Sequence, residues 1–321
     1  MIRLGILGCS EIAFRRFMPA AQKVEGLKVV AVAEQYDKTK IAPFCETYGI
    51  EGMESFDELI ARDDIDAIYV PQPPAFHYMW AKKALEAGKH VLIEKPSTTS
   101  LSDSKDLVDL ARSKGLALHE NYMFQYHSQI SKIKEMIDSG VIGDIRLYSA
   151  QFGFPMRSSN DFRYSKKLGG GALLDAGGYT IKLATLYLGD TISVDAAKLN
   201  DLDGFEVDMY GNARLINNDG VVFNVAFGMD CGYRCSLEAW GSIGRLYTNR
   251  IFTAPDGYEP VVYIETNEGT KEVKLEADSH FTTSIREFIA EISDADKRGK
   301  MYDGILLQAS LVEKVAELGT K

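Results

Sequence analysis

The sequence predicts an α/β domain with a parallel sheet, followed by an α+β domain with a large, mainly antiparallel open sheet. In the first third of the chain, short apolar runs alternate with amphipathic stretches, a pattern typical of parallel strands joined by helices. From about Ser193 to Lys274, alternating apolar and polar residues are separated by turn sequences, which indicates antiparallel strands. At 321 residues, the chain exceeds what one hydrophobic core usually supports, so we expect two domains.

The first domain is expected to span residues 1–121. Its predicted strands are the apolar runs Arg3–Leu7, Lys28–Ala33, Ala67–Val70, His90–Ile93 and Ala117–His119. Helical periodicity predicts helices between them, at Ile12–Val24, Phe76–Ala87 and Ser102–Lys114. Ser100 precedes the last of these helices as a capping residue, and Gly115 follows it as a stop signal.

Residues 122–321 are expected to form the second domain, because the pattern changes after about Glu120. A helix is predicted at Gln129–Asp138, and the glycine-rich segment Leu168–Gly171 leads into another helix. The turn sequence Asn217–Gly220 predicts a hairpin between two strands. Two helices finish the chain, Phe281–Ile292 and Gly304–Leu318, and the C-terminal one is a candidate for packing back on the first domain.

The composition disfavours several classes of partner. A net charge of −10 repels phosphate backbones and anionic membrane surfaces, which argues against nucleic-acid and membrane binding. No apolar run approaches the length of a membrane span, and the N-terminus lacks the apolar region of a signal peptide. The four cysteines match no zinc-binding or CxxC spacing, so we expect reduced thiols, no metal and a cytoplasmic location.

A dinucleotide-binding motif follows the first predicted strand. Residues 8–13 match the pattern G-x-G-x-x-G/A except at Ser10, which takes the place of the middle glycine. Gly8 permits the tight turn, Ala13 permits close helix–strand packing, and the helix N-terminus offers N–H groups to a pyrophosphate. Ser10, Glu11 and Ile12 are therefore candidate cofactor contacts. A tight βα turn without a ligand is the alternative, but its place in a β–α–β pattern predicts a Rossmann domain.

Glu34 is the candidate for cofactor specificity. It ends the second predicted strand, 21 residues after Ala13 (34 − 13). A carboxylate at this point accepts hydrogen bonds from ribose hydroxyls and repels a 2′-phosphate, which favours NAD over NADP. Lys38 and Lys40 lie close enough along the chain to keep NADP open, and a solvated surface glutamate is the alternative.

Lys95 is the first catalytic candidate. It lies in Glu94-Lys95-Pro96, directly after the apolar run Val91–Ile93. Ligands of open α/β sheets bind outside the carboxyl ends of the strands, so Lys95 is expected to point toward a ligand. An ammonium there donates to a carbonyl oxygen and depresses the pKa of a neighbouring acid. Taken alone, it is equally an exposed lysine at a strand end.

Together these segments resemble the glucose-fructose oxidoreductase/inositol dehydrogenase/MocA (Gfo/Idh/MocA) family over nearly the full chain. The matching segments are Gly8–Ala13, Pro71–His77, Glu94–Pro96, Gly140–Gly143 and Gly169–Asp175. The resemblance implies an oxidoreductase that uses NAD(H) or NADP(H), and it implies a homodimer or homotetramer. It also makes Pro71, Pro73, His77, Glu94 and Lys95 candidate cofactor contacts. For His77, a position that merely starts a helix is the alternative.

Tyr179 is the second catalytic candidate. The family pattern usually continues Asp-x-Gly-x-His, and Tyr179 stands where the histidine is expected, four residues after Asp175. This resembles the tyrosine-bearing branch, which includes dihydrodiol dehydrogenases and nucleotide-sugar 3-ketoreductases. A phenol stays protonated near pH 7, so it can protonate the oxygen of a ketone under reduction while Lys95 stabilises the oxyanion. Asp175, on the same predicted helix face, is expected to orient Lys95 or a substrate hydroxyl; an ordinary core tyrosine is the alternative.

Three further stretches resemble reductases of nucleotide-linked deoxysugars, namely Glu120–Phe124, Asp161–Tyr164, and Asn249–Pro255 with Glu259–Val262. Arg163 and Tyr164 are therefore candidate substrate contacts, since a guanidinium matches phosphate oxygens and an aromatic ring packs on a base or sugar. For Arg250, an ordinary surface or interface pair is the preferred interpretation. The predicted activity is reduction of a 3-keto nucleotide-linked hexose. A dihydrodiol or simple-sugar dehydrogenase and a non-catalytic NAD(P)-binding redox sensor are the alternatives.

Overall fold

The computed structural model describes residues 1–320, which divide into two compact units. The first unit contains residues 1–121 and 281–306, and the second contains residues 122–280 with the chain from Leu307 onward. The last helix, α9 (Ala295–Gly319), thus supplies residues to both. Residues 281–306 pack with the first unit. The division into functional domains at 1–121 and 122–321 stays a prediction. Among residues 1–320, no helix is long and apolar enough to cross a membrane.

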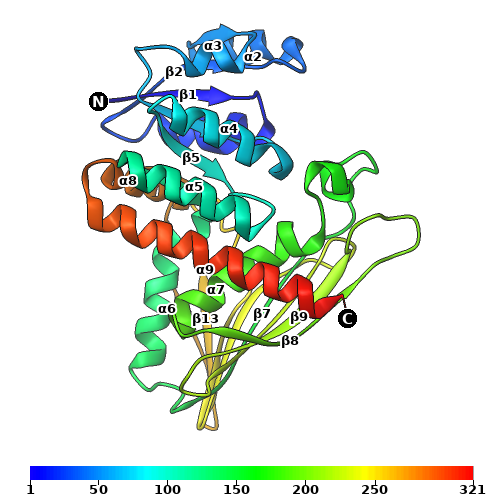
Figure 1. Cartoon of the computed structure of the whole chain (residues 1–321). Helices are drawn as coiled ribbons and strands as arrows, with labels where there is room; N and C mark the ends of the chain where they lie inside the picture. Colours follow the sequence, from blue (N-terminus) through cyan, green and yellow to red (C-terminus); the bar gives the residue numbers. More distant parts are fainter. Residues whose placement is uncertain (321) are drawn as a thin grey trace. The chain divides into compact units, whose positions relative to one another are not determined.

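A parallel six-stranded sheet forms the centre of the first unit (Figure 1). Its strands are β1 (Ile2–Leu7), β2 (Leu27–Ala33), β3 (Glu51–Met53), β4 (Ala67–Val70), β5 (His90–Glu94) and β6 (Leu118–Asn121). They lie in the order β3-β2-β1-β4-β5-β6, and every pair is parallel. The chain order reverses between β1 and β4, and open α/β sheets bind ligands at such a reversal.

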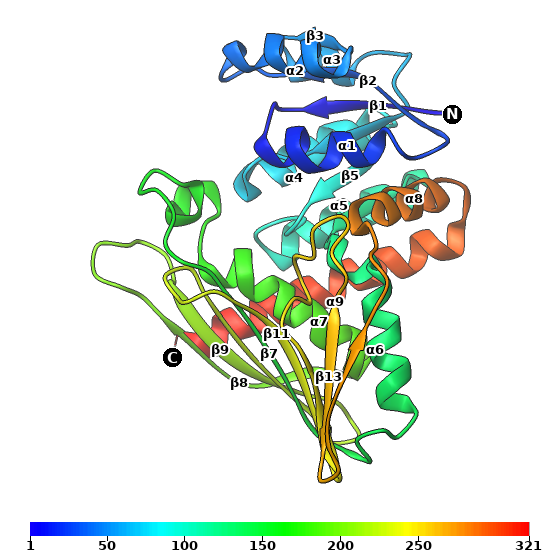
Figure 2. The same ribbon diagram turned by 180° about the vertical axis from the view of Figure 1, so that it is seen from behind.

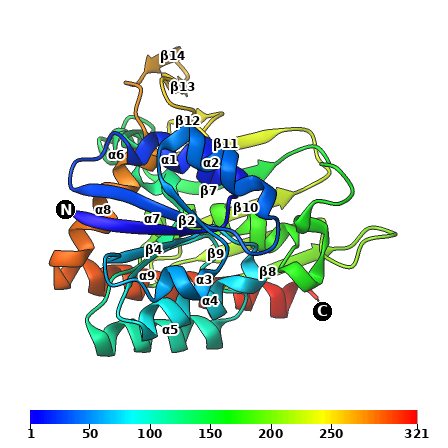
Figure 3. The same ribbon diagram turned by 90° about the horizontal axis from the view of Figure 1, so that it is seen from above.

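Helices cover both faces of this sheet, with α1 and α2 on one side and α4 and α5 on the other (Figure 3). The helices are α1 (Met18–Ala21), α2 (Ile41–Tyr48), α3 (Phe56–Ile60), α4 (Pro74–Glu86), α5 (Leu101–Lys114) and α8 (His280–Ser293). α5 starts one residue before the predicted Ser102, and its predicted capping and stop residues are confirmed, because Ser100 Oγ accepts from the backbone of Asp103 and Gly115 takes a φ of 65°.

The helix predicted at Ile12–Val24 differs from the one observed. Residues Ala13–Phe17 form a π-helical turn, and α1 then ends at Ala21. β3 and α3 were not predicted, because elements of three and five residues are too short to show a period.

The second unit is built on an eight-stranded sheet in the order β14-β13-β12-β11-β7-β10-β9-β8. Its strands are β7 (Ile145–Gly153), β8 (Ser193–Asn200), β9 (Tyr210–Ile216), β10 (Val222–Gly228), β11 (Arg234–Gly241), β12 (Gly244–Thr248), β13 (Val261–Thr266) and β14 (Gly269–Lys274). Only the β7–β10 pair is parallel, so the predicted mainly antiparallel sheet is confirmed. β7, which the sequence pattern did not reveal, lies at the centre.

Helices α6 (Ser128–Asp138) and α7 (Gly178–Leu188) and the end of α9 lie on one side of this sheet (Figures 1 and 2). Phe223, Val225 and Phe227 of β10 are buried, as their shared face predicts. Tyr187 of α7 packs over this face, 5.3 Å from the ring of Tyr148. The outward face is solvated, and Trp240 there is 54% exposed.

Candidate functional site

The turn after β1 fits a dinucleotide. Gly8 has a φ of 113°, and a Cβ there would overlap the side-chain amide of Gln72, so the position requires glycine. Ser10 caps the helical segment, because its Oγ accepts from Ala13 N at 3.3 Å and its carbonyl accepts from Phe14 N at 3.0 Å. The Ser10 O–H can still donate, and the helix start offers N–H groups to a phosphate.

Glu34 has a structural role that the sequence did not predict. It is buried, and its Oε2 accepts from Cys9 N at 3.1 Å within the glycine turn. Its Oε1 accepts from Tyr36 N at 2.8 Å and from Asp37 N at 3.2 Å. The carboxylate therefore ties the end of β2 to the turn after β1. Its oxygens accept three backbone hydrogen bonds and retain about one further acceptor position, so the ribose contact predicted for Glu34 stays a prediction.

His77 ties together the two loops that follow β4 and β5. It is fully buried, with Nδ1 2.7 Å from the carbonyl oxygen of Pro96 and Nε2 2.6 Å from that of Gln72. Burial lowers the pKa of His77 to about 4, and the two carbonyl contacts oppose that shift. Since both nitrogens face the backbone, His77 shapes the loop beside Pro71 and Pro73; a direct contact with the cofactor stays a prediction.

A buried chain of hydrogen bonds fixes Glu94, the residue before Lys95. Tyr69 Oη and Asn121 Nδ2 each donate to Glu94 Oε1 at 2.7 Å, and burial raises the pKa of Glu94. Ser284 of α8 donates to Asn121 Oδ1 at 2.8 Å, so its oxygen accepts from His119 Nε2, 3.0 Å away. The chain thus links α8, near the end of the sequence, to the strand end that presents Lys95.

Asp208 anchors the start of the segment that carries Asp175 and Tyr179. Its Oδ2 accepts from Leu173 N at 2.7 Å, and its carbonyl accepts from Ala172 N at 2.8 Å. A Cβ on Gly171, whose φ is 119°, would lie 2.5 Å from Asp208 Oδ1, so the close approach needs glycine. Burial raises the pKa of Asp208 to about 6.

Asp208→Asn is expected to change how stability depends on pH. The folded chain holds the Asp208 proton up to about pH 6, whereas the unfolded chain releases it near pH 3.8. The carboxyl therefore lowers the free energy of unfolding as pH rises from 4 to 7, by up to about 3 kcal/mol. Asparagine keeps the acceptor for Leu173 N and does not titrate. Urea unfolding at pH 4, 5, 6 and 7 should show the free energy of unfolding of the variant rising relative to that of the wild type as pH increases. A constant difference between the two proteins would contradict this.

Tyr179 lies in an aromatic cluster at the start of α7. It is 7% exposed, and its ring centroid lies 5.5 Å from Tyr122, 5.7 Å from Phe124, 5.1 Å from Phe152 and 5.9 Å from Phe252. Its hydroxyl donates to the sulfur of Met123, a weak acceptor, at 3.7 Å. The preceding turn, Leu173–Gly177, is π-helical, a feature that often marks functional sites.

Asp175 forms an ion pair with Arg163. Arg163 Nε lies 2.7 Å from Asp175 Oδ2, and its Nη1 lies 3.0 Å from Asp161 Oδ1. Two carboxylates therefore neutralise the guanidinium that the sequence suggested for a diphosphate. The hydroxyl of Tyr164 accepts from Arg157 N at 2.7 Å, and the side chain is buried. Both residues build the loop before α7, and their contacts with substrate stay predictions.

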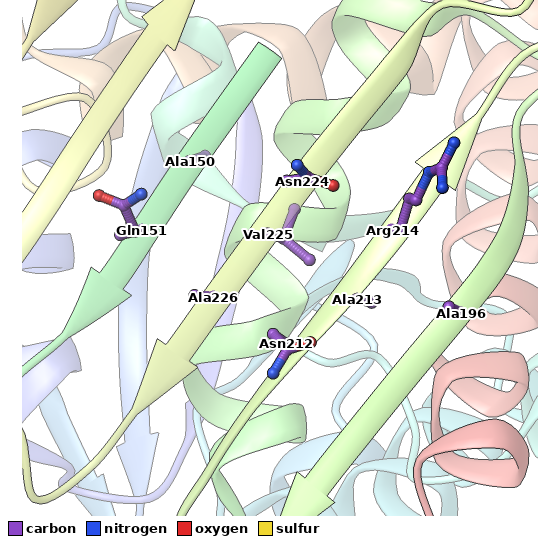
Figure 4. A pocket seen from close by; sticks show the side chains of 9 residues that line it. All are labelled: Ala150, Gln151, Ala196, Asn212, Ala213, Arg214, Asn224, Val225 and Ala226. Carbon is purple, nitrogen blue, oxygen red and sulfur yellow. The ribbon is translucent and has the colours of Figure 1, made fainter. Parts of the chain in front are cut away.

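A hollow of about 350 Å³ lies on the outward face of the second unit's sheet (Figure 4). Its polar lining residues alternate along the strands with residues that face the helices. Gln151 lines the hollow, whereas the next residue of β7, Phe152, points to the other face and contacts Tyr179. The polar members are Gln151, Asn212, Arg214 and Asn224. The hollow therefore opens on the face away from Tyr179, and we assign it no part in the chemistry.

Comparison with known families decides the identity. Residues 2–122 match the model of an oxidoreductase family with an NAD-binding Rossmann fold, GFO_IDH_MocA, and residues 130–247 match a C-terminal domain of that family. The chain belongs to the Gfo/Idh/MocA family. This confirms the predicted family, the fold class and the assignment as an NAD(P)-dependent oxidoreductase.

Gfo/Idh/MocA members similar to this chain include reductases of deoxysugar nucleotides. A dTDP-3,4-didehydro-2,6-dideoxy-α-D-glucose 3-reductase from Actinomadura kijaniata is 41% identical over 315 residues, 98% of this chain and 94% of that protein. One from Streptomyces violaceoruber is 39% identical over 325 residues, 98% of this chain and 95% of that protein. The crystal structure of KijD10, a 3-ketoreductase from A. kijaniata with NADP and TDP-benzene, has a TM-score of 0.95 and 40% identity, covering 99% of this chain and 97% of that one.

Proposed function

We propose that this protein is an NADPH-dependent 3-ketoreductase acting on a dTDP-linked 3-keto deoxyhexose. Full-length similarity to reductases named for such a substrate supports the substrate class. The observation that carries the proposal is a spacing. KijD10 has been crystallised with one lysine or one tyrosine replaced, and those two positions are 84 residues apart. Lys95 and Tyr179 have the same separation (179 − 95).

In the proposed mechanism, Tyr179 protonates the C3 oxygen of the sugar as the ketone is reduced. The ammonium of Lys95 stabilises the negative charge that develops on that oxygen and on the phenolate. Asp175, held by Arg163, orients the substrate or Lys95. The residues of the glycine turn, Gly8 to Ala13, hold the dinucleotide, and the bound reduced nicotinamide supplies the hydride.

We propose NADP(H) rather than NAD(H) as the cofactor. The NAD preference inferred from Glu34 is not supported, because KijD10 contains NADP and because the Glu34 carboxylate is occupied by backbone N–H groups. Lys38 and Lys40 follow Glu34 near the end of β2, where they form exposed ion pairs with Glu54 and Asp37 that a 2′-phosphate can replace. Fluorescence titration should give a lower Kd for NADPH than for NADH; the reverse order would restore the NAD assignment.

The activity is tested by following NADPH absorbance with dTDP-3,4-didehydro-2,6-dideoxy-α-D-glucose. We expect consumption of NADPH with this substrate. In the reverse direction, with NADP⁺, we expect much slower oxidation of free sugars and of trans-dihydrodiols. Faster turnover of free sugars or dihydrodiols would favour the simple-sugar or dihydrodiol alternative. If no 3-keto nucleotide-hexose causes consumption of NADPH or NADH, the proposal is wrong.

A further inference from the structure

We propose that Arg250, flanked by Tyr233 and Tyr258, binds the diphosphate of the nucleotide-sugar substrate. This inference rests on the proposed function. The Arg250 guanidinium carbon lies 5.5 Å from the centroid of the Tyr233 ring and 5.8 Å from that of Tyr258. Two aromatic faces within about 6 Å stabilise a cation while leaving its N–H edge available to an anion.

The side chain is positioned by the protein itself. Arg250 Nε donates to the carbonyl of Thr253 at 3.3 Å, and the Thr253 hydroxyl lies 2.8 Å from Tyr233 Oη. The buried Gln129 donates from Nε2 to the carbonyls of Arg250 and Ile251, both at 3.3 Å. A pre-positioned guanidinium loses less entropy when a ligand binds, and this increases affinity.

Arg250 differs in its charged neighbours from Arg163, the arginine that the sequence favoured as a phosphate contact. Arg163 lies between two carboxylates, whereas Arg250 takes part in none of the ion pairs formed by residues 1–320. An uncompensated guanidinium in a chain of net charge −10 is suited to an anion. Its planar fork matches the oxygens of a phosphate, which a diphosphate presents on both phosphorus atoms.

The location agrees with the chemistry of the substrate. Arg250 lies two residues before Phe252, whose ring packs 5.9 Å from that of Tyr179 and 5.2 Å from that of Phe152. The backbone of this segment is held to β11, because Phe252 N donates to Cys235 Sγ at 3.3 Å. In a nucleotide-sugar the diphosphate is attached at C1, two ring bonds from C3. A cation that binds it must therefore lie near the proton donor, and Arg250 lies two residues along the chain from a ring that packs on Tyr179.

The test is equilibrium binding of dTDP to the full-length protein by calorimetry in the presence of NADPH. Arg250→Gln should weaken dTDP binding about tenfold or more, the usual loss for a hydrogen bond to a charged group. Arg250→Lys should recover part of it. Arg245→Gln is the matched control, because Arg245 also lies over a tyrosine, Tyr247 at 4.9 Å, but pairs with Glu238 and Glu265. It should bind dTDP as the wild type does.

Kinetics give an independent measurement. Arg250→Gln should raise KM for the dTDP-sugar about tenfold or more and leave KM for NADPH unchanged. If Arg250→Gln binds dTDP with wild-type affinity, the inference is wrong. It is also wrong if dTDP affinity falls only when Arg157, whose guanidinium lies over Phe154, is replaced by glutamine. If the wild type itself binds no dTDP, the substrate class of the proposed function fails as well, so the two failures are distinguishable.

Discussion

Replacing Tyr179 by phenylalanine is expected to reduce turnover of the 3-keto substrate by about 10²–10⁴-fold. The variant lacks the phenol hydroxyl, whose proton goes to the C3 oxygen in the proposed mechanism. The ring contacts with Tyr122, Phe124, Phe152 and Phe252 persist, because phenylalanine keeps the ring. Turnover is measured by NADPH consumption, and fluorescence titration should show unchanged NADPH binding.

Tyr187→Phe is the matched control for this experiment. Tyr187 lies on the same helix, is also buried, and its hydroxyl has no hydrogen-bond partner among the described residues. Burial raises its pKa far above the usual range, so it has no part in proton transfer near pH 7. Its removal should leave turnover within about threefold. If Tyr179→Phe retains a similar rate to this control, Tyr179 is not the proton donor.

Lys95→Met is expected to lower kcat by about 10²-fold, the usual effect of removing one donor to a developing oxyanion. Methionine is unbranched like lysine, is one atom shorter and carries no charge. The loss should appear in kcat, because the interaction strengthens as charge develops on the substrate oxygen. Steady-state kinetics with the dTDP-sugar and NADPH measure it.

Two further lysine variants make the Lys95 result specific. Lys95→Arg keeps the positive charge and should retain more activity than Lys95→Met, though not all of it, since the two cations differ in shape. Lys83→Met removes a half-buried lysine of α4 that pairs with Asp57, and kcat should stay within about twofold. An unchanged kcat in Lys95→Met with a raised KM for NADPH would mean that Lys95 only binds the cofactor.

The candidate site could be predicted from the sequence where the signal is local. Gly8 and Ala13 lie at fixed positions of one short motif, so neighbouring residues in the sequence are enough to predict the tight turn. Lys95 follows the apolar run Val91–Ile93, whose place in the alternation of strands and helices indicates a buried strand. The position of Tyr179 after a glycine-rich segment likewise depends on only a few neighbours.

Other parts of the site leave no local trace. Asp208 supports the segment of Tyr179 from 35 residues away, through its bond to Leu173 N. Ser284 lies 163 residues from Asn121, its hydrogen-bond partner. Neither residue belongs to a motif, and a single polar residue in the sequence does not reveal which distant group it meets. The signal that was missed in both cases is burial, which only packing creates.

By itself, the sequence determined the fold class and the glycine turn, because periodicity and turn chemistry act over a few residues, and its resemblance to the family indicated the two catalytic candidates. The tertiary structure decided what the charged residues do. Arg163 and Glu34 looked suited to ligands, yet folding surrounds the first with carboxylates and the second with backbone N–H groups. Arg250 looked ordinary, and no carboxylate among residues 1–320 forms an ion pair with it. The energy of a charge depends on its neighbours in space, and the order of residues does not specify those neighbours.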